Sequence, residues 1–428
     1  MKLLALLEAE VAGTVEITGS RAIFRYADSW LTSAGSYPLS QSIPLQPQPV
    51  TGTRVVNFLW GLLPDNQRTL DVWARQFQVS ARNPVALLAH VGADCAGAVQ
   101  FVPEGRVADV TVAARRPPQV DWLSRGELAD RIRRLAQNSG EGRLTAAEGQ
   151  FSLSGAQSKT ALYRDERGDR WGVPSGRTPT THILKPLSNG FDGFAENEHF
   201  CLELARRLGL AAASTDWRLI GGIPTLIAAR YDRVRSGARW LRVHQEDCCQ
   251  ALGVSPTSKY ESEGGPGFPQ IMTLLDGSDE PEVDRDRLMS AAGLAFFLGA
   301  TDAHAKNYSL LYARGAERSS LRLAPLYDIA SAWPYPRRIP IQKMKLAMRV
   351  GRHYKIQEMQ PRHFDQLARA CNYPADRLRA LMHGMADRLP DEASALMKEI
   401  RTKAMAHAVL AKIVDGIGRQ CRAWAKLQ

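Results

Sequence analysis

The chain has 428 residues, of which 44% are hydrophobic and 23% are charged. This composition is that of a globular protein, and it excludes intrinsic disorder, a collagen-like repeat and a continuous coiled coil. Lysine and arginine outnumber aspartate and glutamate by 55 to 44. The resulting net charge of +11 favours anionic partners such as nucleotides, nucleic acids or acidic proteins.

Cysteine usage and the apolar segments predict a cytoplasmic protein. The six cysteines are scattered without a C-x-x-C pair, so neither a disulfide scaffold nor a zinc site is expected. The apolar run at Met1–Leu7 is broken by Glu8 and Glu10, unlike a signal peptide. The longest apolar segment, Ala291–Ala300, is about half of a membrane span. We therefore expect no membrane attachment.

Three regions follow from the order of the expected elements. Residues 1–115 mix short strands and helices, and residues 116–231 are rich in strands after an initial helix. Residues 232–428 are predicted to be mostly helical, with one hairpin at Tyr308–Asp328. For a chain of this length, two to three domains are expected.

The first chemical motif is the turn of small residues at 152–160, with the sequence SLSGAQSKT, between two short expected strands. Such a turn lets backbone N–H groups approach a phosphate closely. Its end is similar to a P-loop, but the leading glycine of G-x-x-x-x-G-K-[ST] is missing, and an ordinary hairpin turn is the alternative. The residues expected to hold phosphate are Ser154, Gly155, Ala156, Gln157, Ser158 and Lys159.

The second motif pairs a lysine with a glutamate. Lys185 lies in an apolar strand predicted at Thr181–Leu187, where its ammonium group costs stability unless it meets an anion. Glu198 lies on the amphipathic helix predicted at Phe194–Leu208, at the buried edge of its apolar face. A strand lysine paired with a helix glutamate holds the α- and β-phosphates of ATP in kinases. The alternative is a solubilising lysine on an edge strand.

The third motif, at 302–307, has the sequence DAHAKN and follows an apolar helix at Leu288–Ala300. An Asp followed by four residues and an Asn has the spacing of a kinase catalytic loop, in which Asp302 would accept the substrate proton and Asn307 would hold Mg²⁺. His304 and Lys306 are the basic residues available to steady the transferring phosphate. Alone, this spacing also fits a solvated loop after a helix.

The fourth motif is Asp328, at the end of the expected hairpin. An aspartate there can serve as a second metal ligand, although a helix-capping role is the alternative. The phosphate loop, the lysine, the glutamate and the Asp…Asn…Asp set occur in the order found in kinases. This shared order argues against coincidence.

These motifs resemble the HipA family, the serine/threonine kinase toxins of bacterial toxin–antitoxin modules. The similarity extends over nearly the whole chain, from Arg25-Tyr26 to the PRHF segment at 361–364. Matching segments are FSLSGAQSKTAL at 151–162, THILKP at 181–186, RYDR at 230–233, KYESEGGPG at 259–267, GATDAHAKNYS at 299–309 and PLYDIASA at 325–332.

The resemblance implies an α+β fold of the two-lobed protein-kinase type. An extra N-terminal α/β subdomain would occupy 1–115, a kinase N-lobe with the phosphate loop 116–231, and an all-helical C-terminal lobe 232–428. It also implies ATP and Mg²⁺ as cofactors, with Asp302 as the catalytic base. The further implied ATP residues are Lys185, Ala229, Arg230, Tyr231, Asn307 and Asp328, the last two as Mg²⁺ ligands.

The resemblance further implies partners and a modification. The family's partner is a HipB-like helix-turn-helix antitoxin, and the kinase contacts operator DNA mainly through this antitoxin. The proteins that the family's kinases phosphorylate include aminoacyl-tRNA synthetases. Ser152 matches the family's autophosphorylated serine, and Ser154 is a second candidate. Ser158 departs from the family pattern. Residues 337–355 carry seven lysines and arginines and no acidic residue, which suits either DNA or an acidic substrate.

Two other functions share parts of this pattern. A small-molecule phosphotransferase of the aminoglycoside or choline type uses the same Asp…Asn…Asp chemistry. A catalytically idle corepressor would bind the antitoxin and operator without turning over ATP. The kinase toxin remains the leading interpretation, because the resemblance covers nearly the whole chain.

Overall fold

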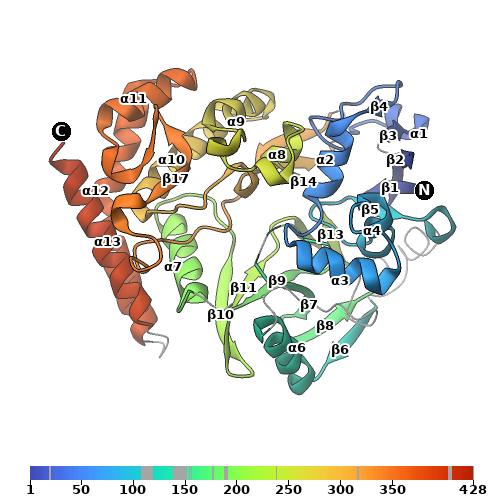
Figure 1. The fold of residues 1–428 in the computed structure, drawn as a ribbon, viewed down its shortest axis with the longest axis horizontal. Coiled ribbons are helices and arrows are strands. Elements are labelled where there is room, and N and C mark those ends of the chain that lie inside the picture. Colours follow the sequence, from blue (N-terminus) through green and yellow to red (C-terminus); the bar gives the residue numbers. More distant parts are fainter. Residues whose placement is uncertain are drawn as a thin grey trace. The chain divides into compact units, whose positions relative to one another are not determined.

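The computed structural model describes two compact units, each made of three separate stretches of the chain (Figure 1). Unit 1 comprises Met1–Asn189, Arg218–Thr257 and Leu310–Leu321, and unit 2 comprises Gly190–Trp217, Ser258–Ser309 and Arg322–Gln428. The description covers all residues except 19–20, 108–118, 138–151, 154, 156, 176–177, 188–190, 238, 316–317, 403–406 and 428. The three-region division expected from the sequence stays a prediction.

Unit 1 begins with a five-stranded sheet in the order β4-β3-β2-β1-β5. Alternate residues of β3, Ala22, Phe24 and Tyr26, are buried, as expected for a strand with one face on the core. The strands are β1 (Lys2–Leu7), β2 (Glu10–Thr18), β3 (Arg21–Tyr26), β4 (Val50–Thr51) and β5 (Gln100–Val102). The accompanying helices are α1 (Asp28–Leu31), α2 (Thr53–Gly61), α3 (Gln67–Phe77) and α4 (Pro84–Val91).

A six-stranded sheet follows, in the order β10-β11-β9-β7-β8-β6. Its strands are β6 (Val120–Leu123), β7 (Thr160–Asp165), β8 (Arg170–Pro174), β9 (His182–Pro186), β10 (Thr215–Ile220) and β11 (Ile223–Ala229). The apolar face of α6 (Arg125–Gln137) packs on this sheet, where Leu128, Ile132 and Leu135 share a core with Leu184 and Ile227. The central position of β9 fixes the surroundings of Lys185.

The region 232–428 contains more strands than the sequence predicted. Besides the expected hairpin of β15 (Ser309–Ala313) and β16 (Ser320–Leu323), it contains the hairpin of β12 (Arg233–Ser236) and β13 (Arg239–Arg242). It also contains β14 (His244–Asp247), which joins β15 and β16, and the pair β17 (Lys345–Val350) and β18 (His353–Lys355). The expectation of an all-helical region was therefore wrong in this detail, because short charged strands pair with partners that local patterns do not reveal.

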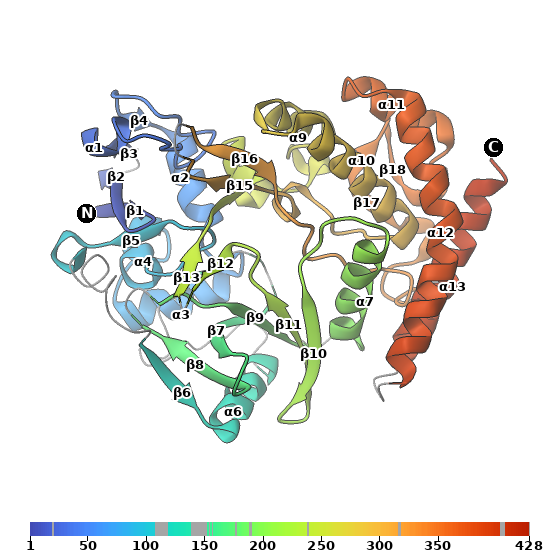
Figure 2. The ribbon, with the colours of Figure 1, turned by 180° about the vertical axis from the view of Figure 1, so that it is seen from behind.

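Unit 2 is built mainly from helices. The predicted helices at Phe194–Leu208 and Leu288–Ala300 are confirmed as α7 (Phe194–Arg207) and the second half of α10 (Pro281–Leu298). The other helices are α9 (Phe268–Leu274), α11 (Pro361–Ala370), α12 (Ala375–Thr402) and α13 (Ala408–Ala425), with α8 (Cys248–Ala251) belonging to unit 1. Both views show α12 and α13 side by side (Figures 1 and 2).

The core of unit 2 is aromatic. The rings of Phe296, Phe297, Phe364 and Trp424 contact one another edge to face, with centroids 5.1 to 6.0 Å apart. These contacts fix the C-terminal end of α10, from which the DAHAKN loop departs. Within the described residues, none of the helices combines the length and the apolar character needed to cross a membrane.

Candidate active site

The start of the phosphate loop is buried and tied down on both sides. Ser152 is 0% exposed, its Oγ donates to the carbonyl of Leu62 at 2.7 Å, and its N–H donates to the carbonyl of Asp94 at 2.9 Å. Gly155 bridges Pro64 in parallel orientation. The loop therefore rests on segments from the first 102 residues of the chain.

Gly155 has a backbone conformation that other residues rarely adopt, with φ at +110°. A Cβ atom there would lie 2.6 Å from Nζ of Lys159, so the lysine ammonium group lies against the glycine. Gln157, Ser158 and Lys159 are half-buried. The predicted sites Ser154 and Ala156 lie outside the described residues.

Lys185 is on an interior strand rather than an edge strand. Its strand β9 lies between β11 and β7, where Lys185 pairs with Leu226 and is 6% exposed. This position excludes the alternative of a solubilising surface lysine. Glu198 is also buried, on α7 of unit 2, and its pairing with Lys185 stays a prediction.

The three predicted adenine-binding residues follow one another at the end of β11. Ala229 and Tyr231 are half-buried, and the Tyr231 hydroxyl donates to Oε1 of Gln245. The guanidinium group of Arg230 is buried and bonds to Asp232, to Oγ1 of Thr180 and to the carbonyl of Cys95. The side chain of Arg230 therefore serves the interior of unit 1 rather than a nucleotide.

Asp302 is the exposed member of the DAHAKN loop, with a side chain that is 70% exposed. The amide nitrogen of Asn307 donates to the Asp302 carbonyl at 2.7 Å, across the short helix η6 (Ala305–Asn307). The hydroxyl of Tyr260 donates to Oδ1 of Asp302. The loop thus presents a carboxylate to solvent on a braced backbone, where a substrate hydroxyl could reach it.

His304 differs from its expected role. Its side chain is 5% exposed, and burial lowers its pKa to about 4, so the ring is uncharged at neutral pH. The sequence predicted a basic group here, but desolvation disfavours the charged form. Lys306, which is also buried, is the remaining cation of the loop.

Asp328 lies in a segment that runs alongside the turn containing Asn307. The Tyr327 hydroxyl donates to the carbonyl of Lys306 at 2.8 Å and shares a 2.6 Å hydrogen bond with Oγ of Ser309. Asp328 itself has φ at +54°, a left-handed conformation that is uncommon outside functional sites and turns.

Asn307 and Asp328 suit Mg²⁺ by their chemistry. With its amide nitrogen donating, Asn307 offers its Oδ1, and Asp328 offers a carboxylate; both residues are partly exposed. Mg²⁺ in kinase-type sites takes one or two protein oxygens together with water and substrate phosphates. Among the described residues, no group of three or more His, Cys, Asp or Glu side chains is arranged to hold a metal ion.

Two contributors to the site were missed by sequence reasoning. Tyr260 contacts Asp302 from 42 positions away, and its only sequence signal was the KYESEGGPG match to the family. Asn197 accepts from the N–H of Ser331 and donates to its carbonyl, both at 2.8 Å. This two-way amide pairing fixes the chain shortly after Asp328.

Two family models cover most of the chain. The model described as HipA N-terminal domain matches residues 3–102, and the HipA-like C-terminal domain matches residues 151–393. The chain belongs to the HipA family. The α+β fold of the kinase-like HipA type, expected from the sequence, is confirmed.

Similar proteins agree with this assignment. The protein Y4mE of Sinorhizobium fredii is 34% identical over 88% of this chain and 87% of its own length. The serine/threonine-protein kinase toxin HipA of Shewanella oneidensis is 30% identical over 75% of this chain and 72% of its own length. The solved complex of Shewanella oneidensis HipA with HipB and its operator DNA contains a similar fold, with a TM-score of 0.83, 24% identity and coverage of 99% of this chain and 98% of that chain.

Proposed function

We propose that this chain is an ATP-dependent serine/threonine protein kinase that acts as the toxin of a toxin–antitoxin module. The observation that carries the proposal is the exposed carboxylate of Asp302 on a loop braced by Asn307, in a chain of the HipA family. A solvent-facing carboxylate in this loop can accept the proton of a protein hydroxyl as it attacks the γ-phosphate.

The other residues divide the remaining work. Lys185 and the loop Ser154–Lys159 bind the phosphates, while the backbone of residues 229–231 borders adenine. Asn307 and Asp328 hold Mg²⁺, which neutralises the charge that develops on the transferring phosphoryl group. Lys306 supplies the cation that uncharged His304 does not. Glu198 orients Lys185, as the corresponding glutamate does in kinases.

Autophosphorylation of Ser152 or Ser154 would switch the enzyme off. Ser152 supports this proposal because its hydroxyl is buried against Leu62, so it must leave this position to be modified. A phosphoserine carries about −1.5 to −2 charges at pH 7, and it cannot take the buried position in which the Ser152 hydroxyl donates to the Leu62 carbonyl. The phosphate loop would then stay displaced and ATP affinity would fall.

The proposed partners are a HipB-like antitoxin, operator DNA reached mainly through it, and a protein substrate such as an aminoacyl-tRNA synthetase. Two basic residues of the segment 337–355 form ion pairs with acidic side chains, which partly neutralise their charge. Arg349 pairs with Glu261 at 2.9 Å and Lys355 with Glu358 at 2.7 Å. Direct DNA binding by this segment is accordingly the weaker proposal. A cytoplasmic location is proposed to match these partners.

Expression of the chain without a partner tests the toxin role. Growth should stop, the Asp302→Asn variant should be harmless, and co-expression of a HipB-like antitoxin should restore growth. Labelled ATP added to lysate should mark a protein; labelling of a small molecule alone would favour the phosphotransferase. Operator binding together with an antitoxin, but without any phosphoryl transfer, would favour the idle corepressor.

A further inference from the structure

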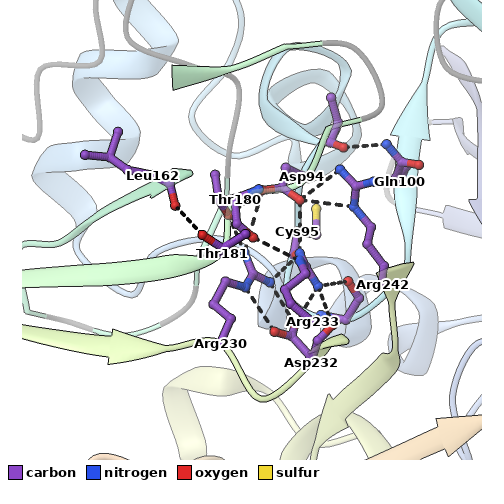
Figure 3. Close-up of polar contacts among 12 residues, drawn as sticks. Asp94, Cys95, Gln100, Leu162, Thr180, Thr181, Arg230, Asp232, Arg233 and Arg242 are labelled. Carbon is purple, nitrogen blue, oxygen red and sulfur yellow. Dashed lines mark hydrogen bonds and ion pairs between the residues drawn. The ribbon is translucent and has the colours of Figure 1, made fainter. Parts of the chain in front are cut away.

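A buried cluster of charged side chains joins parts of unit 1 that are far apart in the sequence (Figure 3). Asp94 lies in the N-terminal domain after α4, while Arg230, Asp232 and Arg233 follow β11 and Arg242 ends β13. All five side chains are between 0 and 9% exposed. The cluster therefore belongs to the interior of unit 1.

The carboxylate of Asp94 is where the cluster converges. Its Oδ1 accepts from Nη2 of Arg233 at 3.0 Å and pairs with Nη2 of Arg242 at 3.1 Å. Its Oδ2 accepts from the N–H and the hydroxyl of Thr180, at 3.1 and 2.6 Å. Thr180 lies just before β9, the strand that contains Lys185.

The backbone at the same point reaches the phosphate loop. The carbonyl of Asp94 accepts from the N–H of Ser152, and the next carbonyl, of Cys95, accepts from Arg230 at 2.9 Å and Arg233 at 3.1 Å. Residues 94 and 95 thus hold three elements at once: the start of the phosphate loop, the segment 230–233 and the approach to β9.

The charges make Asp94 difficult to replace. Three guanidinium groups share two carboxylates. Burial alone would raise the pKa of Asp94, but the three neighbouring arginines hold that pKa well below its usual range; they are Arg233, Arg242 and Arg230. Burial, followed by the neighbouring Arg230, lowers the pKa of Arg233 to about 10. Neutralising Asp94 would leave Asp232, which pairs with Arg230 and Arg233, as the one carboxylate of this cluster against its three buried guanidinium groups.

We propose that Asp94 is a positioning residue for nucleotide binding. Its carboxylate and the carbonyls of residues 94 and 95 hold the phosphate loop and the segment 230–233 at the separation that a purine nucleoside triphosphate requires. The N-terminal domain thereby takes part in nucleotide affinity without touching the nucleotide. This inference rests on the ATP-binding role proposed above.

The test compares nucleotide affinity with stability in the full-length chain. Asp94→Asn and the milder Thr180→Val should each remain folded at 20 °C, and Thr180→Val keeps the test valid if the first variant fails to fold. Calorimetric titration with adenosine and with a non-hydrolysable ATP analogue plus Mg²⁺ should show affinity lowered about tenfold in Asp94→Asn, the size expected for one lost charged hydrogen bond. Thr180→Val should show a smaller loss of the same sign.

Two controls separate positioning from general destabilisation. Adding Arg242→Gln to Asp94→Asn rebalances the buried charge, so the unfolding midpoint should recover while the affinity does not. Asp284→Asn removes an equally buried carboxylate in unit 2, which accepts from Arg322 at 3.0 Å and Arg287 at 2.9 Å, and should lower stability with adenosine affinity unchanged.

Other outcomes of these titrations would contradict either the positioning role of Asp94 or the proposed kinase function. Affinity that recovers together with stability in the double variant, or that falls equally in Asp284→Asn, would reduce Asp94 to a structural residue. Wild-type affinity in both Asp94→Asn and Thr180→Val would overturn the positioning role alone. A wild-type chain that binds neither ligand would overturn the proposed kinase function, and with it this inference.

Discussion

Two residues proposed to take part in phosphoryl transfer, the base Asp302 and the modified serine Ser152, are held in opposite ways. Asp302, the proposed base, is 70% exposed on a loop braced through backbone and side-chain contacts. Ser152, the proposed site of modification, is 0% exposed, with both its hydroxyl and its N–H bonded inside unit 1. The proposed base is therefore accessible in the folded state, whereas Ser152 could be modified only after a local rearrangement.

The largest effect is expected when the exposed carboxylate of Asp302 is neutralised. Asp302→Asn should lower phosphoryl transfer by about 10²-fold or more, because the amide cannot accept the substrate proton. Transfer from labelled ATP measures this, and ATP affinity should stay near the wild-type value. Asp276→Asn, which changes another exposed acid of unit 2, is the matched control. Substantial kinase activity in Asp302→Asn would refute the assignment.

The DAHAKN loop also contains a buried titratable group, His304, which should make the stability of the fold depend on pH. The folded pKa of His304 is lowered to about 4, below the ordinary value of 6.5, so its contribution to stability is complete above pH 6.5 and is lost as the pH falls toward 4. Between pH 7.5 and 5, the wild type should lose about 2 kcal/mol more unfolding free energy than His304→Gln. Urea unfolding at both pH values measures the difference. Equal losses would show that the ring is protonated in the folded chain.

A smaller effect, on stability, is expected when the buried Ser152 is replaced. Ser152→Ala removes the hydrogen bond to the Leu62 carbonyl and should lower stability by about 1 kcal/mol, whereas Ala at exposed Ser29 should change it little. Mass spectrometry after incubation with ATP and Mg²⁺ then identifies the modified residue. Phosphate that persists on the 152–160 peptide of this variant would assign the site to Ser154, Ser158 or Thr160.

The smallest expected effect concerns the hydroxyl that contacts the base. Tyr260→Phe removes the hydrogen bond to Asp302 while keeping the ring beside His304, whose centroid lies 5.0 Å away. Because an exposed hydrogen bond contributes little, kcat should change by less than about tenfold. Steady-state kinetics measure the change. A loss as large as that of Asp302→Asn would make Tyr260 part of the catalytic machinery.

Local sequence patterns correctly predicted the helices whose apolar residues recur with helical spacing. The apolar spacing of α7 and α10 was sufficient to place both helices, and the family-wide motifs gave the fold class. The strands β12, β13, β17 and β18 were missed because they are short and basic, and their stability comes from pairing rather than from propensity. The Asp94 cluster was also missed, since its members are up to 148 positions apart and only Arg230 was expected to have a role, as a contact of adenine.

The interleaved course of the chain has a consequence for its synthesis. In unit 1, Nε2 of Gln41 donates to the hydroxyl of Tyr312 at 3.1 Å, a contact that joins residues 271 positions apart. At about 5–20 residues per second, a ribosome needs on the order of 15 to 55 s to make the intervening chain. Non-local contacts of this kind also slow folding after release. Until residues 310–321 have been made, the nascent polypeptide lacks part of unit 1, so we expect newly made chains to need chaperones before this unit can fold.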